Sequence, residues 1–279
     1  MSVINTNINA LFAQSAMKTN AREMSSAMQQ LSTGNRINSA GDDAAGVAVV
    51  QSMTAQIRGL NQAVRNANDA VNLLQTAEGS MVEQTNMLQR MRELAVQAAN
   101  GTYSSTQRNY LQTEFDELGS QIDDISADTT WNGKQLLDAT DATGINGVSG
   151  QFDFQVGQDS GQTISVSIDD MSLSGLGADG LDISTASGAS TAIGTLDDAL
   201  DLINAQRADI GAGINRLTYA ADNLSNVSAN VAASRSTIQD TDYASASTEL
   251  SRAQIIQQAS TAMLAQANQQ PQTVLALLK

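Results

Sequence analysis

The 279-residue sequence contains neither cysteine nor histidine. Without cysteine the chain can form no disulfide, no thiolate nucleophile and no thiolate metal site. Histidine is the commonest general base, so its absence removes most hydrolase mechanisms. Paired carboxylates remain available among the 29 Asp and Glu, but a solvated acidic surface is the simpler interpretation. We therefore expect no catalytic, metal or cofactor site.

Aromatic residues and proline are scarce as well. Phe, Trp and Tyr make up 3% of the chain, whereas globular cores draw much of their buried area from such rings. The apolar residues are mainly Ala, Leu, Ile, Val and Met, which suit narrow seams between helices. The single proline, Pro271, leaves the preceding sequence free of proline breaks. This composition favours long helices packed along their sides.

The chain also lacks long apolar runs and a basic face. Its first residues show no basic segment followed by an apolar one, so we expect no cleaved Sec-type signal peptide. The longest run of apolar residues and glycine, 44–50, is far shorter than a membrane span. Between residues 109 and 206 there are 17 acids and one base, whereas residues 1–40 and 235–279 are nearly neutral. We expect neither nucleic acid, which requires a basic face, nor a membrane as partner.

Apolar residues recur every seven positions in two distant parts of the chain. A companion column, from Met53 through Leu60 to Leu88, runs beside the first of them. The residues predicted to form the helix seam are Val50, Ile57, Val64, Val71, Ile203, Ile210, Leu217 and Leu224. Such columns are the a and d positions of a coiled-coil-like seam. They predict helices over residues 44–99, 104–128 and 193–234, packed together as a long antiparallel helical rod.

One region between the predicted helices has a clear β pattern. Two short runs, at residues 152–156 and 164–168, alternate apolar and polar side chains and predict a hairpin over 151–169. Residues 131–134 (WNGK) predict a turn. Residues 171–192 are rich in Gly, Ser, Ala and Asp and are predicted to form a surface loop. The fold class is therefore mainly α, with a small β-hairpin region.

The two ends carry narrower apolar stripes with Gln, Asn and Ser elsewhere. Their residues are Ile4, Ile8, Leu11, Met17, Met24, Met28, Leu31, Ile256, Met263, Val274, Leu277 and Leu278. Because helices owe most of their stability to packing, we expect both ends to be disordered in the free chain and to order in an assembly. The predicted domains are an inner domain of residues 1–40 with 235–279 and an outer one of residues 41–234.

Several motifs resemble those of the bacterial flagellin family. They are residues 31–46 (LSTGNRINSAGDDAAG), 88–97 (LQRMRELAVQ), 251–257 (SRAQIIQ) and 265–279 (AQANQQPQTVLALLK). The resemblance covers residues 1–170 and 192–279. The segment between these ranges is short, so the resemblance implies a short form without the outer variable domains. Trp131 stands where the family more often has Phe.

The resemblance implies a structural subunit of the flagellar filament and not an enzyme. The subunit would be secreted and would polymerise through its terminal helices, paired as an inner coiled coil, into a hollow tube used for swimming. Implied partners are further copies of the chain, an export chaperone, and hook-junction and cap proteins. A host Toll-like receptor would be a secondary partner. The positions matching its contacts, which also lie between protofilaments, are Gln89, Arg90, Leu94 and Glu114.

The alternatives to a flagellin are a hook–filament junction protein, a flagellin carrying a zinc protease, and a toxin or adhesin. A hook–filament junction protein has similar ends, but the motif at residues 88–97 favours a flagellin. A flagellin carrying a zinc protease would need a His-Glu-x-x-His helix, which a chain without histidine cannot supply. A toxin or adhesin would need a large variable outer domain. The Ser- and Thr-rich residues 184–195 fit O-linked sugars and an unmodified loop equally well.

Overall fold

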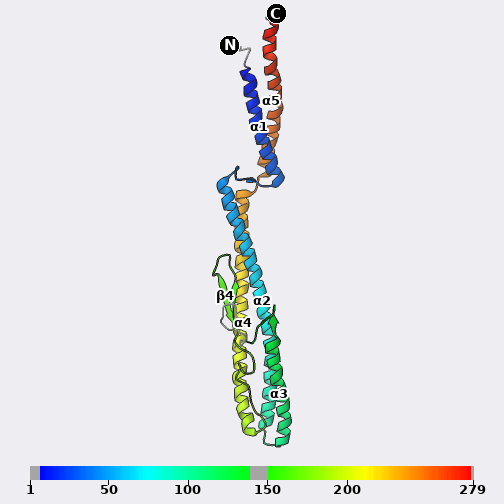
Figure 1. The fold of residues 1–279 in the computed structure, drawn as a ribbon, viewed down its shortest axis with the longest axis vertical. Helices are drawn as coiled ribbons and strands as arrows, with labels where there is room; N and C mark the ends of the chain where they lie inside the picture. The colour runs from blue at the N-terminus through cyan, green and yellow to red at the C-terminus, as the bar shows by residue number, and fades with distance from the viewer. Residues whose placement is uncertain (1–6, 139–149, 278–279) are drawn as a thin grey trace. The chain divides into compact units, whose positions relative to one another are not determined.

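The computed structural model describes residues 7–138 and 150–277, with side chains as far as Gln269. In chain order the elements are α1 (Ile8–Thr33), α2 (Ala44–Ala99), α3 (Ser105–Asp128), β1 (Thr130–Trp131), β2 (Lys134–Gln135), β3 (Gln151–Gln155), β4 (Thr163–Ser167), α4 (Ala186–Gln239) and α5 (Tyr243–Leu277) (Figure 1). The predicted mainly α fold with a small β region is confirmed.

The described residues belong to two units, which we consider separately. Unit 1 contains residues 1–57 and 229–279, and unit 2 contains residues 58–228. Both α2 and α4 contribute to each unit, because each helix continues across a unit boundary. The domain boundaries predicted from the sequence, after residues 40 and 234, lie nearer to the chain ends.

Side-chain caps mark the starts of α3 and α2, and the predicted turn is present. Ser104 and Gln107 form a capping box at the start of α3, each side chain bonding the other's backbone N–H. At the start of α2, Asp43 Oδ1 accepts from Gly46 N at 2.8 Å. The predicted turn joins β1 to β2, and its central residues Asn132 and Gly133 have φ of 52° and 77°. Those angles are the ones that a tight two-residue hairpin requires.

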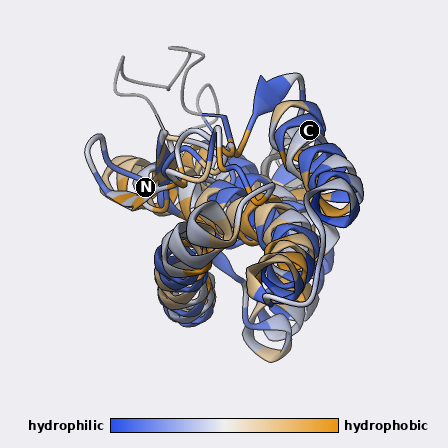
Figure 2. Ribbon diagram, turned by 90° about the horizontal axis from the view of Figure 1, so that it is seen from below, coloured by the Kyte–Doolittle hydropathy of each residue, from blue (hydrophilic) through white to orange (hydrophobic). Residues whose placement is uncertain are grey.

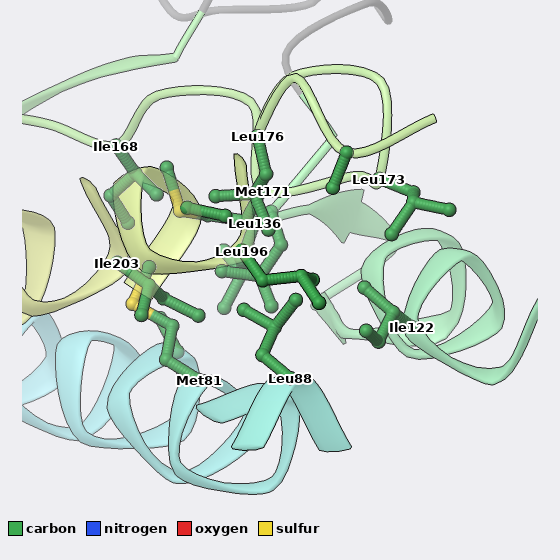
Figure 3. Packing of buried hydrophobic residues seen from close by; sticks show 14 of the residues in the cluster. Met81, Leu88, Ile122, Leu136, Ile168, Met171, Leu173, Leu176, Leu196 and Ile203 are labelled. Carbon is green, nitrogen blue, oxygen red and sulfur yellow. The ribbon is translucent and has the colours of Figure 1, made fainter. Parts of the chain in front are cut away.

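The core of unit 2 lies where α2, α3 and α4 meet, as predicted. Figure 3 shows Met81 and Leu88 of α2, Ile122 of α3, and Leu196 and Ile203 of α4 pointing toward one another. All five are fully buried. Figure 2 looks along the helices, and single helices carry both apolar and polar residues, as helices covered on one side do.

The seam columns agree well with the structure in α4 and less well in α2. Ile203, Ile210 and Leu217 are 0% exposed, and Leu224 is half-buried. In α2, Val50 is buried, whereas Ile57, Val64 and Val71 are only half-buried. The column buried there instead, beside the companion column from Leu60 to Leu88, contains Ala63, Ala70, Ala77, Met91 and Ala98.

The shift of the α2 seam has a structural cause. Asn66 lies on the alanine side of α2, and its Nδ2 donates to the carbonyl of Gln155 in β3 at 3.1 Å. The β3–β4 hairpin, in which Phe152 pairs with Val166, therefore covers the alanine side of this stretch. A helix that is covered on two sides buries a wider stripe than a two-helix seam does, and small alanines allow the close approach.

The surface loop predicted over residues 171–192 is wrong in two respects. First, α4 begins at Ala186, where Thr185 Oγ1 accepts from Gly188 N, and Ala189 and Ala192 are fully buried. Burial of small residues overrides their weak or loop-like propensity. Second, residues before α4 belong to the core, because Met171, Leu173, Leu176, Ala178 and Ile183 are all buried.

Polar side chains of the helices hold this buried segment in place. Asp123 Oδ1 accepts from Leu173 N at 2.7 Å, and Gln84 Nε2 donates to Met171 O at 3.1 Å. Gln112 both accepts from Ile183 N and donates to Leu181 O. These contacts satisfy backbone groups that burial would otherwise leave without partners.

Among the described residues, no helix is long and apolar enough to cross a membrane. Within the same residues no group of three or more acidic side chains is placed to hold a metal ion.

Candidate assembly interface

In unit 1, α1 and α5 pack side by side and antiparallel (Figure 1). The residues that they bury against each other are small: Ala27 from α1, with Ala246 and Ala253 from α5, are each 3–4% exposed. Ala246 and Ala253 are seven residues apart, as in a coiled-coil seam. Small side chains bring the helices close but remove little apolar surface from water, so this pair gains modest stability from packing.

The same seam buries a polar residue, Asn20, at 3% exposure. Its Nδ2 donates to Ala253 O at 2.8 Å and to Gln257 Oε1 at 3.2 Å. Sliding α5 by one turn would take the Gln257 side chain away from the amide, although another backbone carbonyl could replace that of Ala253. A buried asparagine can fix the register of a helix pair in this way.

A second asparagine joins the start of α1 to the far part of α5. Asn7 is the N-cap of α1, with Oδ1 accepting from Ala10 N, and its Nδ2 donates to Ala267 O at 2.8 Å. Pro271, four residues after Ala267, has no backbone N–H. The carbonyl of Ala267 therefore lacks its usual donor within α5, and Asn7 supplies one.

The connection between α1 and α2 is tightly organised around the predicted motif of residues 31–46. Asp42 Oδ2 accepts from the backbone N–H of Ser39 and of Asn38, which lowers the pKa of Asp42 below its ordinary value. A Cβ at Gly46 would lie 2.6 Å from Ile37 Cδ1 and 2.5 Å from Asp43 Oδ2, so a larger residue there would require both side chains to shift. Arg36 donates to the carbonyl of Ile238 at the end of α4.

Large apolar side chains remain exposed on α1 and α5. Phe12 is 72% exposed, Ile255 67% and Met263 65%. Phe12 and Met263 also line a cleft of about 570 Å³ between the two helices, together with alanines at 13, 16, 259 and 267. Unit 1 thus exposes apolar surface of the kind that marks an interaction site.

The structure divides the predicted terminal stripe into two sets. Met17, Met24 and Leu31 are half-buried and turn toward the α1–α5 seam. Five others are exposed: Ile8, Leu11, Met28, Ile256 and Met263. Ile4 and Leu278, and the side chains of Val274 and Leu277, lie outside the described residues.

Sequence reasoning missed Phe12, Ile255 and the two asparagines. Phe12 and Ile255 each adjoin a predicted stripe residue, so a wider stripe would have included them. Asn20 lies seven residues before Ala27, and this heptad spacing was the available signal.

The predicted receptor-contact set lies in unit 2 and is mixed in exposure. Arg90 donates to Glu114 at 2.8 Å and to Glu93 at 3.0 Å. The hydrogen bond to Glu114, and then that to Glu93, raise the pKa of Arg90 above its ordinary value. Gln89 is exposed, whereas Leu94 is 1% exposed and belongs to the core. Of the four residues, Gln89, Arg90 and Glu114 therefore lie on the surface of unit 2, and Leu94 lies in its core.

Charge is distributed very unequally between the units. Unit 1 holds six of the 14 Lys and Arg and six of the 29 Asp and Glu. The remaining eight bases and 23 acids fall in unit 2, so the net charge of −15 lies entirely there. A neutral unit with exposed apolar side chains can be packed against copies of itself without accumulating like charge.

Known proteins match both halves of the chain. Residues 4–142 match the model for the bacterial flagellin N-terminal helical region, and residues 193–278 the model for its C-terminal helical region. The chain is 42% identical over 285 residues to the flagellar filament 33 kDa core protein of Treponema phagedenis, covering 99% of this chain and 100% of that protein. It is 43% identical over 281 residues to a flagellin of Halalkalibacterium halodurans, with the same coverage. The crystal structure of Bacillus cereus flagellin is similar at 33% identity and a TM-score of 0.51, over 57% of this chain and 88% of that one.

Proposed function

This chain belongs to the bacterial flagellin family and is a structural subunit of the flagellar filament, not an enzyme, and from this premise we propose that it polymerises with copies of itself through α1 and α5. It is a short form of the family, since its match to the Treponema protein covers 99% of this chain and 100% of that protein. The polymer would be a hollow tube outside the cell that serves swimming.

The observation that carries the proposal is the exposed apolar surface of unit 1. Phe12 and Met263 flank an open cleft, and Ile8, Leu11 and Ile255 are more than half exposed nearby on the same two helices. Burying such side chains contributes about 1.5–3 kcal/mol each. The seam inside the chain buries little by comparison, so contacts with neighbouring copies would supply most of the packing of these helices.

The charge distribution supports the same arrangement. Neutral unit 1 would lie where copies are most crowded, and acidic unit 2 would face water, where salt screens its charge. The disorder of both ends in the free subunit, expected from the sequence, stays a prediction. The small buried surface between α1 and α5 is consistent with it.

The direct test is seeded polymerisation of the purified chain. We expect long, smooth filaments in negative-stain images after filament fragments and salt are added. A variant without residues 1–40 and 235–279 should form none, yet should keep a cooperative melt, because unit 2 lies wholly between the cuts. Filaments from the truncated variant, or none from the full chain, would overturn the proposal. Short caps in place of long filaments would favour a hook–filament junction protein.

The remaining partners are proposed from family membership. An export chaperone, hook-junction proteins and a cap protein would meet the chain during secretion and growth of the filament. In a host, the Toll-like flagellin receptor would contact the exposed side chains of Gln89, Arg90 and Glu114 on unit 2. The same face would lie between protofilaments in the polymer, so the receptor would bind the monomer.

Receptor recognition predicts a specific loss. Changing Arg90 or Glu114 to Ala removes one partner of an exposed ion pair and one charge-assisted contact. We expect monomer activity in receptor reporter cells to fall about fivefold to tenfold, while the melting temperature changes little. Lys134→Ala, an exposed charge on β2, should leave the dose-response unchanged. Equal curves for all three variants and the unaltered chain would exclude this contact.

A further inference from the structure

The charged side chains of α1 and α5 have no ionic partners within the described part of the chain. They are Lys18, Arg22 and Glu23 on α1 and Glu249 and Arg252 on α5, and all five residues are exposed. The ion pairs that the described residues do form join side chains of unit 2. Arg22 makes only a long contact of 3.4 Å, to Thr19 of its own helix.

Three of these charges gather around one cleft. Glu23, Glu249 and Arg252 line a space of about 260 Å³ between α1 and α5, together with Ala253 and Ile256. The lining contains two carboxylates and one guanidinium, so the cleft carries a net negative charge. The other two charges, Lys18 and Arg22, are both cationic and lie outside it.

Assembly through this surface would change the surroundings of these charges. Ile256 lines the cleft and Ile255 stands exposed beside it, so a neighbour that covers the isoleucines would also displace water from Glu23 and Glu249. Charges removed from water without a partner cost several kcal/mol. A neighbour that binds here must therefore bring a cation.

We propose that the cleft of one copy receives Arg22, with Lys18 one turn before it, from α1 of a second copy. The proposal rests on the polymerisation proposed above and assigns a specific contact to it. Residues four apart lie on one side of a helix, so both cations can enter together. The guanidinium of Arg22 can bind the carboxylate of Glu249 through two parallel hydrogen bonds.

The geometry of such a contact suits a filament. The contact joins one patch, the cleft, to a different patch, the cationic side of α1. A contact between unlike surfaces leaves one of each free at the two ends of the assembly unless its rotation closes a ring, so an open filament can keep adding copies. A contact between like surfaces would close after two copies.

Charge reversal tests the proposal on the full chain. Arg22→Glu would place two carboxylates together, and Glu249→Arg would place two guanidinium groups together. We expect each variant alone to raise the critical concentration for seeded polymerisation, measured by sedimentation, at least about tenfold. An equal mixture of the two should recover nearly the level of the unaltered chain, because each variant carries the charge that its neighbour lacks.

The mixture separates contacts between copies from contacts within one. If Arg22 paired with Glu249 of its own chain, only the double variant would recover, and the mixture would stay defective. Arg22→Lys keeps the charge but loses the pair of parallel hydrogen bonds, so its critical concentration should lie between those of the unaltered chain and Arg22→Glu. Circular dichroism should show equal helix content throughout, since both residues are exposed.

Each outcome decides one proposal. Single variants that polymerise like the unaltered chain, or a mixture that fails, would overturn the contact while leaving polymerisation in place. Failure of the unaltered chain to polymerise in the same assay would overturn the proposed function itself.

Discussion

Replacing Leu217 with aspartate is expected to abolish the cooperative thermal melt of unit 2. Leu217 is 0% exposed in the apolar core where α4 meets α2. The change removes the packing of a leucine, which costs about 2–5 kcal/mol, and buries a charge without a partner, which costs several more. Domains are stable by about 5–15 kcal/mol in total. The loss is thus comparable with the whole stability of the unit, and filaments should disappear with it.

Two other positions give graded controls for this result. Asn215→Asp changes an exposed residue on the same helix and should cost about 0.5 kcal/mol or less. Val64→Asp alters a half-buried position of α2, and we expect an intermediate loss of about 1–3 kcal/mol. Thermal melts followed by circular dichroism would rank the three. Equal melting temperatures for Leu217→Asp and Asn215→Asp would refute the packing described for α4.

Phe12→Asp should eliminate filaments without affecting the fold. Phe12 is 72% exposed in the single chain, so the change costs the free subunit little. In a polymer the ring would be buried, and aspartate would put a desolvated charge at every repeat of the contact. We expect the critical concentration for seeded polymerisation to rise about 100-fold or more, which corresponds to about 2.7 kcal/mol.

The control keeps the apolar character of the position. Phe12→Leu retains most of the apolar surface and should polymerise within about fivefold of the original concentration. Hydrogen exchange or circular dichroism should show that unit 2 is unchanged in both variants. Normal filaments from Phe12→Asp would mean that this side of α1 faces solvent in the polymer.

Much of unit 2 could be predicted because its signals are periodic and local. The column Ile203, Ile210 and Leu217 has the spacing of a seam and is fully buried. The capping box of Ser104 and Gln107 needs only three residues of separation, and it is present. Patterns of this kind depend on the backbone period, which the sequence displays directly.

The position of the α2 seam could not be predicted in the same way. Hydrophobicity ranks Val64 and Val71 above Ala63 and Ala70, yet the alanines are the more buried. The deciding factor is the β3–β4 hairpin on that side of the helix, which is distant in sequence. Likewise, residues 171–185 contain too few apolar residues to show a period, although those few are in the core.

The candidate interface was only partly predictable for a similar reason. Its narrow stripes were visible, but which members face the partner helix and which remain free depends on the register of α1 against α5. That register involves Asn20 and the carbonyl of Ala253, 233 residues away. A polar residue in a thin stripe gives no sign of such a distant partner.

The bond from Asn7 to the carbonyl that Pro271 leaves free has a consequence for the order of synthesis. A ribosome makes Asn7 some 260 residues before it makes Ala267. The start of α1 therefore has no partner in α5 while the residues between them are synthesised, even though domains can fold as their residues emerge. A product that ends before α5 can never pair its α1, even when all of unit 2 has been made. Only a chain that has been translated through α5 can pair its two helices. Polymerisation through α1 and α5 would therefore incorporate only chains that contain both helices.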